Sequence, residues 1–240
     1  MSNILNFPIK YEYPKVTPGD YVLNIVSDLS YMYSHSQNKV IKVLIDTSNA
    51  TNMYYMFFDC DYLIFIPQLD TSKVTNMSCM FMNCGSLLSI PQLDTSNVTT
   101  MEYTFSNCES LTSIPQLDTG KVTNMSNMFN DCTKLKSIPL LNCQNVTSMF
   151  SVFGYSNINS ITDLGGFKDL GKKSVSGISS GFLDRAPNLT HESLMNVINN
   201  LYDRKSNGLS TISISLGTTN LDKLTDEEKA IAINKGWNLS

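Results

Sequence analysis

Four aspartates recur at intervals of 24 residues and form the most regular set of ionisable side chains in the sequence: Asp46, Asp70, Asp94 and Asp118. Carboxylates stacked in this way repel one another unless hydrogen bonds or cations offset their charge. Calcium is one such cation, because it prefers oxygen ligands. The alternative is that each side chain caps backbone N–H groups of its own turn. The sequence lacks the glycine-rich repeat of calcium-binding β-rolls, so we expect turn caps and no metal site.

Cysteines follow the same interval, and they too could do chemistry. Those at one repeat position are Cys60, Cys84, Cys108 and Cys132, whereas Cys79 and Cys143 lie elsewhere. A stacked row of cysteines is compatible with free buried thiols, with some disulfide or with a metal site. No C-x-x-C pair occurs, and the two histidines, His35 and His191, lie near no nucleophilic or metal-binding motif. We therefore expect free thiols, no catalytic residues, no enzyme activity and no cofactor.

A third set of residues is a candidate ligand surface. Glutamines follow the recurring prolines, and variable or aromatic residues precede them in the same part of the repeat. Stacked glutamines can instead satisfy one another, and the aromatic residues, with Tyr54 and Tyr55, can instead pack against an N-terminal cap. The predicted ligand surface consists of Tyr62, Ile64, Phe65, Gln68, Leu88, Gln92, Thr112, Gln116 and Lys136.

These residues all belong to a 24-residue repeat that runs from Asp46 to about Gly165, with a weaker copy opening at Asn142. Self-similarity at such a period is typical of a solenoid, because one unit cannot bury its apolar face without neighbours. Each copy carries the same apolar positions. In the third copy they are Val98, Met101, Phe105, Cys108, Leu111, Ile114, Pro115 and Leu117.

One copy predicts the course of a coil. Val98, Met101 and Phe105 are spaced i, i+3 and i+7, which favours a short helical or 3-10 segment after a capped turn. The stretch ending in Ile114 and Pro115 favours a short strand, which the proline ends because it has no N–H to donate. The predicted fold is α/β: a leucine-rich-repeat solenoid with short parallel strands stacked into one curved sheet, helical or 3-10 segments opposite, and a cap at each end.

The repeat weakens at both ends of the chain. Residues 22–45 match it as a degenerate first coil, and residues 1–21, rich in tyrosine and proline, predict either a further cap or an arm for attachment. The solenoid therefore spans 22–165. Residues 166–240 predict an α/β cap that continues it, with Thr190 as the N-cap of one helix and a capping box from Thr225 to Glu228 opening another.

Charge and hydropathy exclude several functions. The net charge is −4, and only 16% of residues are charged, below the roughly 25% of typical domains. Residues 46–165 hold four lysines and ten acidic residues, so a nucleic-acid partner is not expected. No apolar run reaches membrane-spanning length, and the first residues lack a charged segment followed by an apolar one. We expect no membrane insertion and no secretory signal.

The repeats resemble the BspA-like leucine-rich repeats of bacterial surface proteins. The resemblance rests on L-x-S-I-P-Q-L-D-T-S-x-V-T-x-M, as in Leu87–Met101, and on M-F-x-x-C, as in Met128–Cys132. The segment from Asn188 to Leu239 resembles the ends of phage-encoded repeat proteins of gut bacteria. The resemblance implies a solenoid used for adhesion or recognition without catalysis.

From the resemblance we expect a non-enzymatic recognition protein, a tail or fibre-associated component of a phage virion that binds the host cell surface. A host glycan or surface protein and other virion proteins are the expected partners, and oligomers are compatible with the sequence. The protein would be made in the cytoplasm and act on the virion or an extracellular surface without its own signal peptide. The alternatives are a bacterial surface adhesin of the BspA-like type and a purely structural virion protein.

Overall fold

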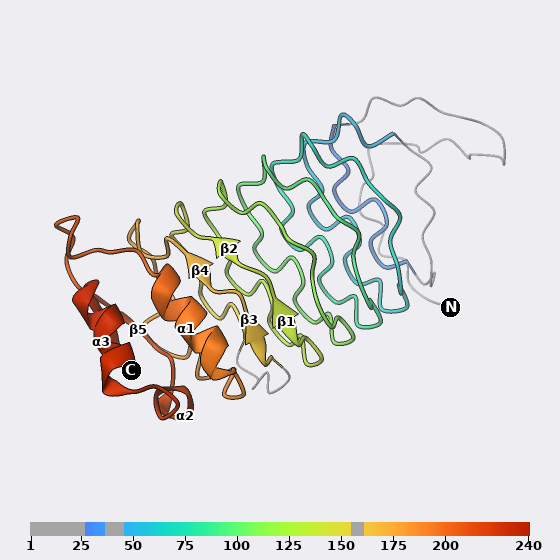
Figure 1. Ribbon diagram of the computed structural model, residues 1–240. Helices are drawn as coiled ribbons and strands as arrows, with labels where there is room; N and C mark the ends of the chain where they lie inside the picture. The colour runs from blue at the N-terminus through green and yellow to red at the C-terminus, as the bar shows by residue number, and fades with distance from the viewer. Residues whose placement is uncertain (1–26, 37–45, 155–160) are drawn as a thin grey trace, which may run out of the picture.

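The computed structural model describes residues 27–36, 46–154 and 161–240. In Figure 1 successive coils lie side by side along an elongated stack, coloured from blue to yellow, and the labelled helices gather at its C-terminal end. The predicted arm or cap at 1–21 lies outside the described residues, as do 22–26 and 37–45 of the predicted first coil.

Each coil pairs with the next one at an offset of 24 residues. The paired residues form parallel bridges that join Asp28 to Asn52, Asn52 to Asn76, Asn76 to Thr100, Thr100 to Asn124 and Asn124 to Ser148. Residues 27–36 take part in the same pattern, since the backbone N–H of Tyr31 donates to the carbonyl of Tyr54 at 3.0 Å. Equivalent residues of successive coils therefore lie above one another, which turns a repeated residue type into a row.

The segment after each bridge differs from the sequence-based expectation. A short helical or 3-10 segment was expected there, but within residues 46–154 this part of every coil is a run of turns. Alternate N–H groups donate to the next coil, as Met77 does to Thr100 at 3.2 Å. Two residues per coil adopt positive φ, for example Cys79 at 57° and Asn83 at 62°. A right-handed helix requires negative φ at each residue, so these two positions exclude one.

The strands also differ from the expectation of one curved sheet. Within the coils they are two residues long and form separate two-stranded sheets. These strands are β1 (Ser137–Ile138), β2 (Leu141–Asn142), β3 (Asp163–Leu164) and β4 (Phe167–Lys168). β1 pairs in parallel with β3, and β2 with β4. In the preceding coil the same stretch is reduced to a single bridge from Ser113 to Ser137. Pro139 interrupts the pairing between β1 and β2, because proline has no N–H to donate.

Identical side chains stack through the core. The rings of Phe57, Phe81, Phe105 and Phe129 are parallel to within 7°, with centroids 5.5, 5.7 and 5.8 Å apart in order along the row. All four are buried. Rows of methionine, cysteine, leucine and valine fill the rest of the core in the same way. Each coil thus buries its apolar side chains against the coils before and after it.

The C-terminal segment consists of α1 (His191–Asn200), β5 (Ile212–Ile214), α2 (Thr218–Leu221), α3 (Asp226–Asn234) and β6 (Trp237–Leu239). The predicted N-cap is confirmed: the Thr190 hydroxyl accepts from the Ser193 N–H at 3.2 Å. The capping box of α3 is confirmed as well, with Thr225 and Glu228 bonded reciprocally. α1 packs against β3, β4 and α3, and β5 pairs in parallel with β6.

Trp237 seals the end of the core. It is fully buried, and its indole Nε1 donates to the carbonyl of Tyr202 at 2.9 Å. Gly171 lies against its ring with a φ of 87°, and a Cβ atom there would collide with the indole. Glycine is therefore required at this position both for the backbone conformation and for the approach of the tryptophan.

Candidate ligand-binding surface

The glutamine row is fixed in place by the backbone of the neighbouring coil. The side-chain Nε2 atoms of Gln68, Gln92 and Gln116 donate to the carbonyls of Gln92, Gln116 and Leu140 at 2.7, 2.7 and 2.8 Å. Each Nε2 also donates to the carbonyl of the leucine that follows it in sequence. Within residues 46–154 no hydrogen bond uses the Oε1 atoms of these glutamines, so their acceptors face the solvent in a fixed orientation.

The aspartate row lies two residues further along each coil. Asp46, Asp70, Asp94 and Asp118 each accept a hydrogen bond at Oδ1 from the N–H two residues later, at 2.8, 3.0, 3.0 and 2.9 Å. Their side chains thus cap the turns, as the sequence predicts. Asn142 continues the row and accepts from the Gln144 N–H at 3.2 Å in the same way.

The caps of Asp70 and Asp94 favour the ionised form of these two carboxylates. Hydrogen bonds from the Ser72 hydroxyl and N–H lower the pKa of Asp70 below its ordinary value. Ser96 does the same for Asp94, whose pKa is lowered despite the neighbouring negative charge of Asp70. A hydrogen bond to the charged form of an acid favours that form. The row is therefore negatively charged at neutral pH.

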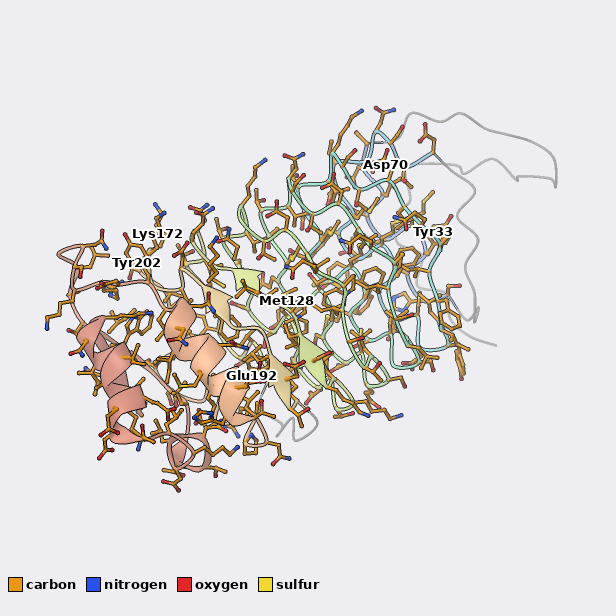
Figure 2. All side chains as sticks on the ribbon, in the orientation of Figure 1. Tyr33, Asp70, Met128, Lys172, Glu192 and Tyr202 are labelled. Atoms are coloured by element: carbon orange, nitrogen blue, oxygen red, sulfur yellow. The ribbon has the colours of Figure 1, made fainter. Side chains whose placement is uncertain are left out.

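The three glutamines and all of the aspartate row except Asp46 line one open groove of about 970 Å³ that crosses successive coils. The lining residues are Gln68, Leu69, Asp70, Thr71, Ser72, Gln92, Leu93, Asp94, Thr95, Ser96, Gln116, Leu117, Asp118, Thr119, Leu140, Asn142 and Lys168. Its floor is almost fully covered and consists of Leu69, Leu93, Leu117, Thr71, Thr95 and Thr119. Leu140 is partly exposed. Figure 2 shows Asp70 on the outer edge of the stack, toward the end that Tyr33 marks.

The charge of the groove changes along the stack. Three carboxylates, Asp70, Asp94 and Asp118, are followed by the neutral amide of Asn142. Lys168 comes next in the same row, since the pairing of β2 with β4 places it beside Asn142. One end of the groove is therefore negative and the other ends in a cation.

The structure divides the predicted ligand surface into two parts. Gln68, Gln92 and Gln116 line the groove, whereas the other predicted residues do not. Thr112 and Lys136 are exposed in the stretch before the proline. Four apolar side chains of that stretch, which we call the apolar strip, are Tyr62, Phe65 and Leu88, exposed by 52, 48 and 45%, and the partly exposed Ile64.

A separate aromatic cluster lies in the turn segments. Tyr54 and Tyr55 contact each other edge to face, and Tyr55 stacks on Tyr31 with centroids 4.9 Å apart. Phe58 meets Tyr55 at 4.7 Å. Among the described residues, no ring contact joins this cluster to the apolar strip.

The sequence reasoning missed that the aspartates share the groove with the glutamines. It interpreted the aspartates as turn caps, which they are, but Asp70, Asp94 and Asp118 also line the groove. It also missed Lys168, which follows the end of the regular repeat. The sequence did contain a signal for the shared groove. Gln-Leu-Asp recurs in three copies, and in an extended stretch the first and third residues of such a unit lie on the same side.

No described cysteine or histidine lines the groove. All six cysteines are free and buried. Burial raises the pKa of Cys132 to about 12, so its thiol stays protonated at neutral pH. The described histidines pair with single carboxylates: His35 with Asp59 at 2.7 Å and His191 with Glu228 at 2.8 Å.

Two absences hold for the residues that the structure describes. None of their histidine, cysteine and acidic side chains form a group of three or more that could hold a metal ion. In the same residues, no helix combines the length and the apolar character needed to cross a membrane.

Residues 16–88 and 51–164 match the family model described as "Mycoplasma protein of unknown function, DUF285". The two matches overlap and together span residues 16–164, more than half of the 240-residue chain. None of the curated proteins matches the chain. The matched region contains the repeated coils, the aspartate and glutamine rows and the apolar strip. The chain belongs to the DUF285 family.

Proposed function

We propose that the chain is a non-enzymatic recognition protein built on leucine-rich repeats of the BspA-like type. In this proposal it is a tail or fibre-associated component of a phage virion and binds the surface of the host cell. The observation that supports recognition is the open groove, in which successive coils present the same acceptor atoms in fixed positions.

Preorganisation explains why such a groove suits binding. A side chain that is already immobilised loses little conformational entropy when a ligand arrives. Each groove glutamine is held by two carbonyls, and each groove aspartate is held by its own turn. The conformational entropy of these side chains is already lost when the chain folds. Their contacts with a ligand therefore contribute more fully to the affinity.

Binding to intact cells tests the proposal. The labelled, purified chain is incubated with a panel of gut-bacterial strains before and after treatment of the cells with periodate or protease. We expect saturable binding to some strains. Loss of binding after periodate would identify a glycan partner, and loss after protease a protein partner. A folded sample that binds no strain, even when presented multivalently, would contradict recognition of these host cells.

The apolar strip supports a second candidate, a structural virion protein. Tyr62, Phe65 and Leu88 are each about half exposed on neighbouring coils. Exposed apolar side chains that lie together are typical of protein contacts. In this candidate the strip packs on a neighbouring virion protein. Particles that lack the chain and still adsorb normally to cells would favour this function over host recognition.

Family membership supports a third candidate, the bacterial surface adhesin. The matched family is described for Mycoplasma, a bacterium, and the repeats resemble those of bacterial surface proteins. Proteolysis of intact bacteria that express the chain tests this candidate. Cleavage by added protease would place the chain on the cell surface and favour the adhesin. Detection of the chain in purified particles instead would favour a virion protein.

A further inference from the structure

Over the three coils that carry Gln68 to Asp118, the groove presents acceptor atoms rather than donors, whereas Asn142 and Lys168 supply donors at its far end. The amide N–H groups of the three groove glutamines already donate to backbone carbonyls. The Thr71 and Thr95 hydroxyls donate to the carbonyls of Asp94 and Asp118, both at 2.8 Å. What remains in these three coils is the Oε1 of each glutamine and the Oδ2 of each aspartate, which no hydrogen bond within 46–154 uses. A matching ligand must therefore be rich in donors.

The acceptors repeat once per coil. Gln92 and Asp94 present the same pair of oxygens as Gln68 and Asp70 in the preceding coil. The centroids of the stacked phenylalanines place successive coils 5.5 to 5.8 Å apart in the core. A regular row of this kind suits a polymer whose own units repeat, because each unit then meets an equivalent set of oxygens. A compact ligand would use only one coil.

The groove has no apolar pocket. Leu69, Leu93 and Leu117 in its floor are each only 3% exposed, and no lining residue is aromatic. An extended peptide usually gains specificity by placing alternate side chains in pockets. A glycan carries hydroxyl donors on every unit and needs no such pocket. The lining therefore favours a glycan over a peptide.

Charge selects among glycans. Asp70, Asp94 and Asp118 repel an anionic polymer and attract a cationic one, and hydrogen bonds between ionised partners are about twice as strong as neutral ones. We propose that the groove binds a linear glycan whose sugar units carry free amino groups, laid along the stack across successive coils. The inference rests on the proposed function, because it names the ligand class of the same recognition surface.

Chitosan oligosaccharides test this inference, with chitin oligosaccharides of the same length as the uncharged counterpart. Binding is measured by calorimetry with the full chain at low and high salt. We expect chitosan to bind at least about tenfold more tightly than chitin, and its affinity to fall as salt screens the charges. Equal affinity for the two oligosaccharides, or no binding of chitosan, would overturn the proposal.

The coil that opens at Asn142 suggests variants that preserve the fold. Asn142 caps its turn as the aspartates do, so D70N/D94N/D118N removes three charges and keeps the caps. We expect it to weaken chitosan binding by at least about tenfold. D61N/E109Q/D131N makes the same charge change at residues that do not line the groove, and it should bind chitosan like the wild type. An equal loss of chitosan affinity in both variants would show that only the net charge of the protein matters, and it would contradict a site in the groove.

Oligolysine of matched charge distinguishes a glycan site from general polycation binding. We expect it to bind less tightly than chitosan, because it lacks the hydroxyl donors that the glutamine oxygens would accept. Affinity equal to that of chitosan would overturn the glycan inference. If chitosan fails to bind while the chain still binds cells, the ligand class is wrong and the proposed function stands. If cell binding also fails, the proposed function falls with it.

Discussion

At the scale of single residues, the phenylalanine row offers the most direct link between sequence and stability. Phe105 is stacked between Phe81 and Phe129 and is almost completely buried. F105A removes both ring contacts and leaves a cavity that the flanking coils cannot fill. We expect a loss of about 3–5 kcal/mol in the free energy of unfolding, measured by urea denaturation. The exposed Tyr62 is the control, and Y62A should change stability little. A loss of stability below about 1 kcal/mol for F105A would show that the flanking coils can close the cavity after all.

Acid titration tests the turn caps. Hydrogen bonds from Ser48, Ser72 and Ser96 lower the pKa values of Asp46, Asp70 and Asp94. An acid with a lowered pKa in the folded state stabilises the fold above its unfolded pKa of about 3.9 and loses this contribution as pH falls through the folded value.

We therefore expect the urea midpoint of the wild type to fall below about pH 4 more steeply than that of D46N/D70N/D94N. The variant keeps neutral caps, as Asn142 does, and its turns do not titrate. D61N serves as a control for loss of an exposed carboxylate that does not belong to the aspartate row. Identical acid profiles for wild type and triple variant would show that the caps contribute nothing that depends on charge.

At the scale of elements, α1 and α3 were predictable, whereas the short α2 and the turn segments were not. α1 and α3 follow the N-caps Thr190 and Thr225, whose hydroxyls each accept from the N–H three residues later. In α3 the Glu228 carboxylate also accepts from the Thr225 N–H. In the coils, the spacing of Val98, Met101 and Phe105 is helical, but the N–H groups bond to the next coil. Such bonds cannot be anticipated from a single repeat.

A local signal against helix was nevertheless present. Asp59, Asn83, Asn107 and Asp131 recur at one position, and all four adopt positive φ. Aspartate and asparagine tolerate this conformation better than most residues. Tyr55, Cys79 and Tyr103 adopt it too, and nothing in their chemistry indicates it. Only the pairing with neighbouring coils holds them there.

The capping box of α3 gives a prediction at this scale. The Thr225 hydroxyl accepts from the Glu228 N–H at 3.2 Å, and the Glu228 carboxylate accepts from the Thr225 N–H at 2.8 Å. We expect T225A to cost about 1 kcal/mol in thermal or urea unfolding, because an N–H group of the first turn loses its partner. T225S retains the hydroxyl and should stay close to the wild type. Equal losses in the two variants would assign the effect to the methyl group instead.

At the scale of the whole molecule, regular stacking predicts that one coil can be removed. Deletion of residues 94–117 joins Leu93 to Asp118, which restores the same Leu-Asp junction and places equivalent rows in contact. We expect a folded protein with a smaller denaturant dependence of unfolding, because the slope scales with the surface exposed. Circular dichroism and urea titration measure both properties. An unfolded or aggregated product would contradict stacking of equivalent units.

The candidate site was predicted in part at this scale. The sequence placed Gln68, Gln92 and Gln116 on a candidate surface because they recur at one position, and the structure brings them into the groove. Tyr62, Phe65 and Leu88 lie on the apolar strip instead. A repeat pattern shows which residues share a row, but the turn between two rows decides which rows face each other. That geometry depends on bonds between coils, which the sequence does not display.

The most direct test of the account compares three proteins on one bacterial strain that binds the wild type. Saturation binding to intact cells is measured for the wild type, for D70N/D94N/D118N and for the matched control D61N/E109Q/D131N. The account predicts that the groove variant loses at least about tenfold in affinity while the control binds like the wild type. Unchanged binding of the folded groove variant would contradict the claim that the groove is the recognition surface.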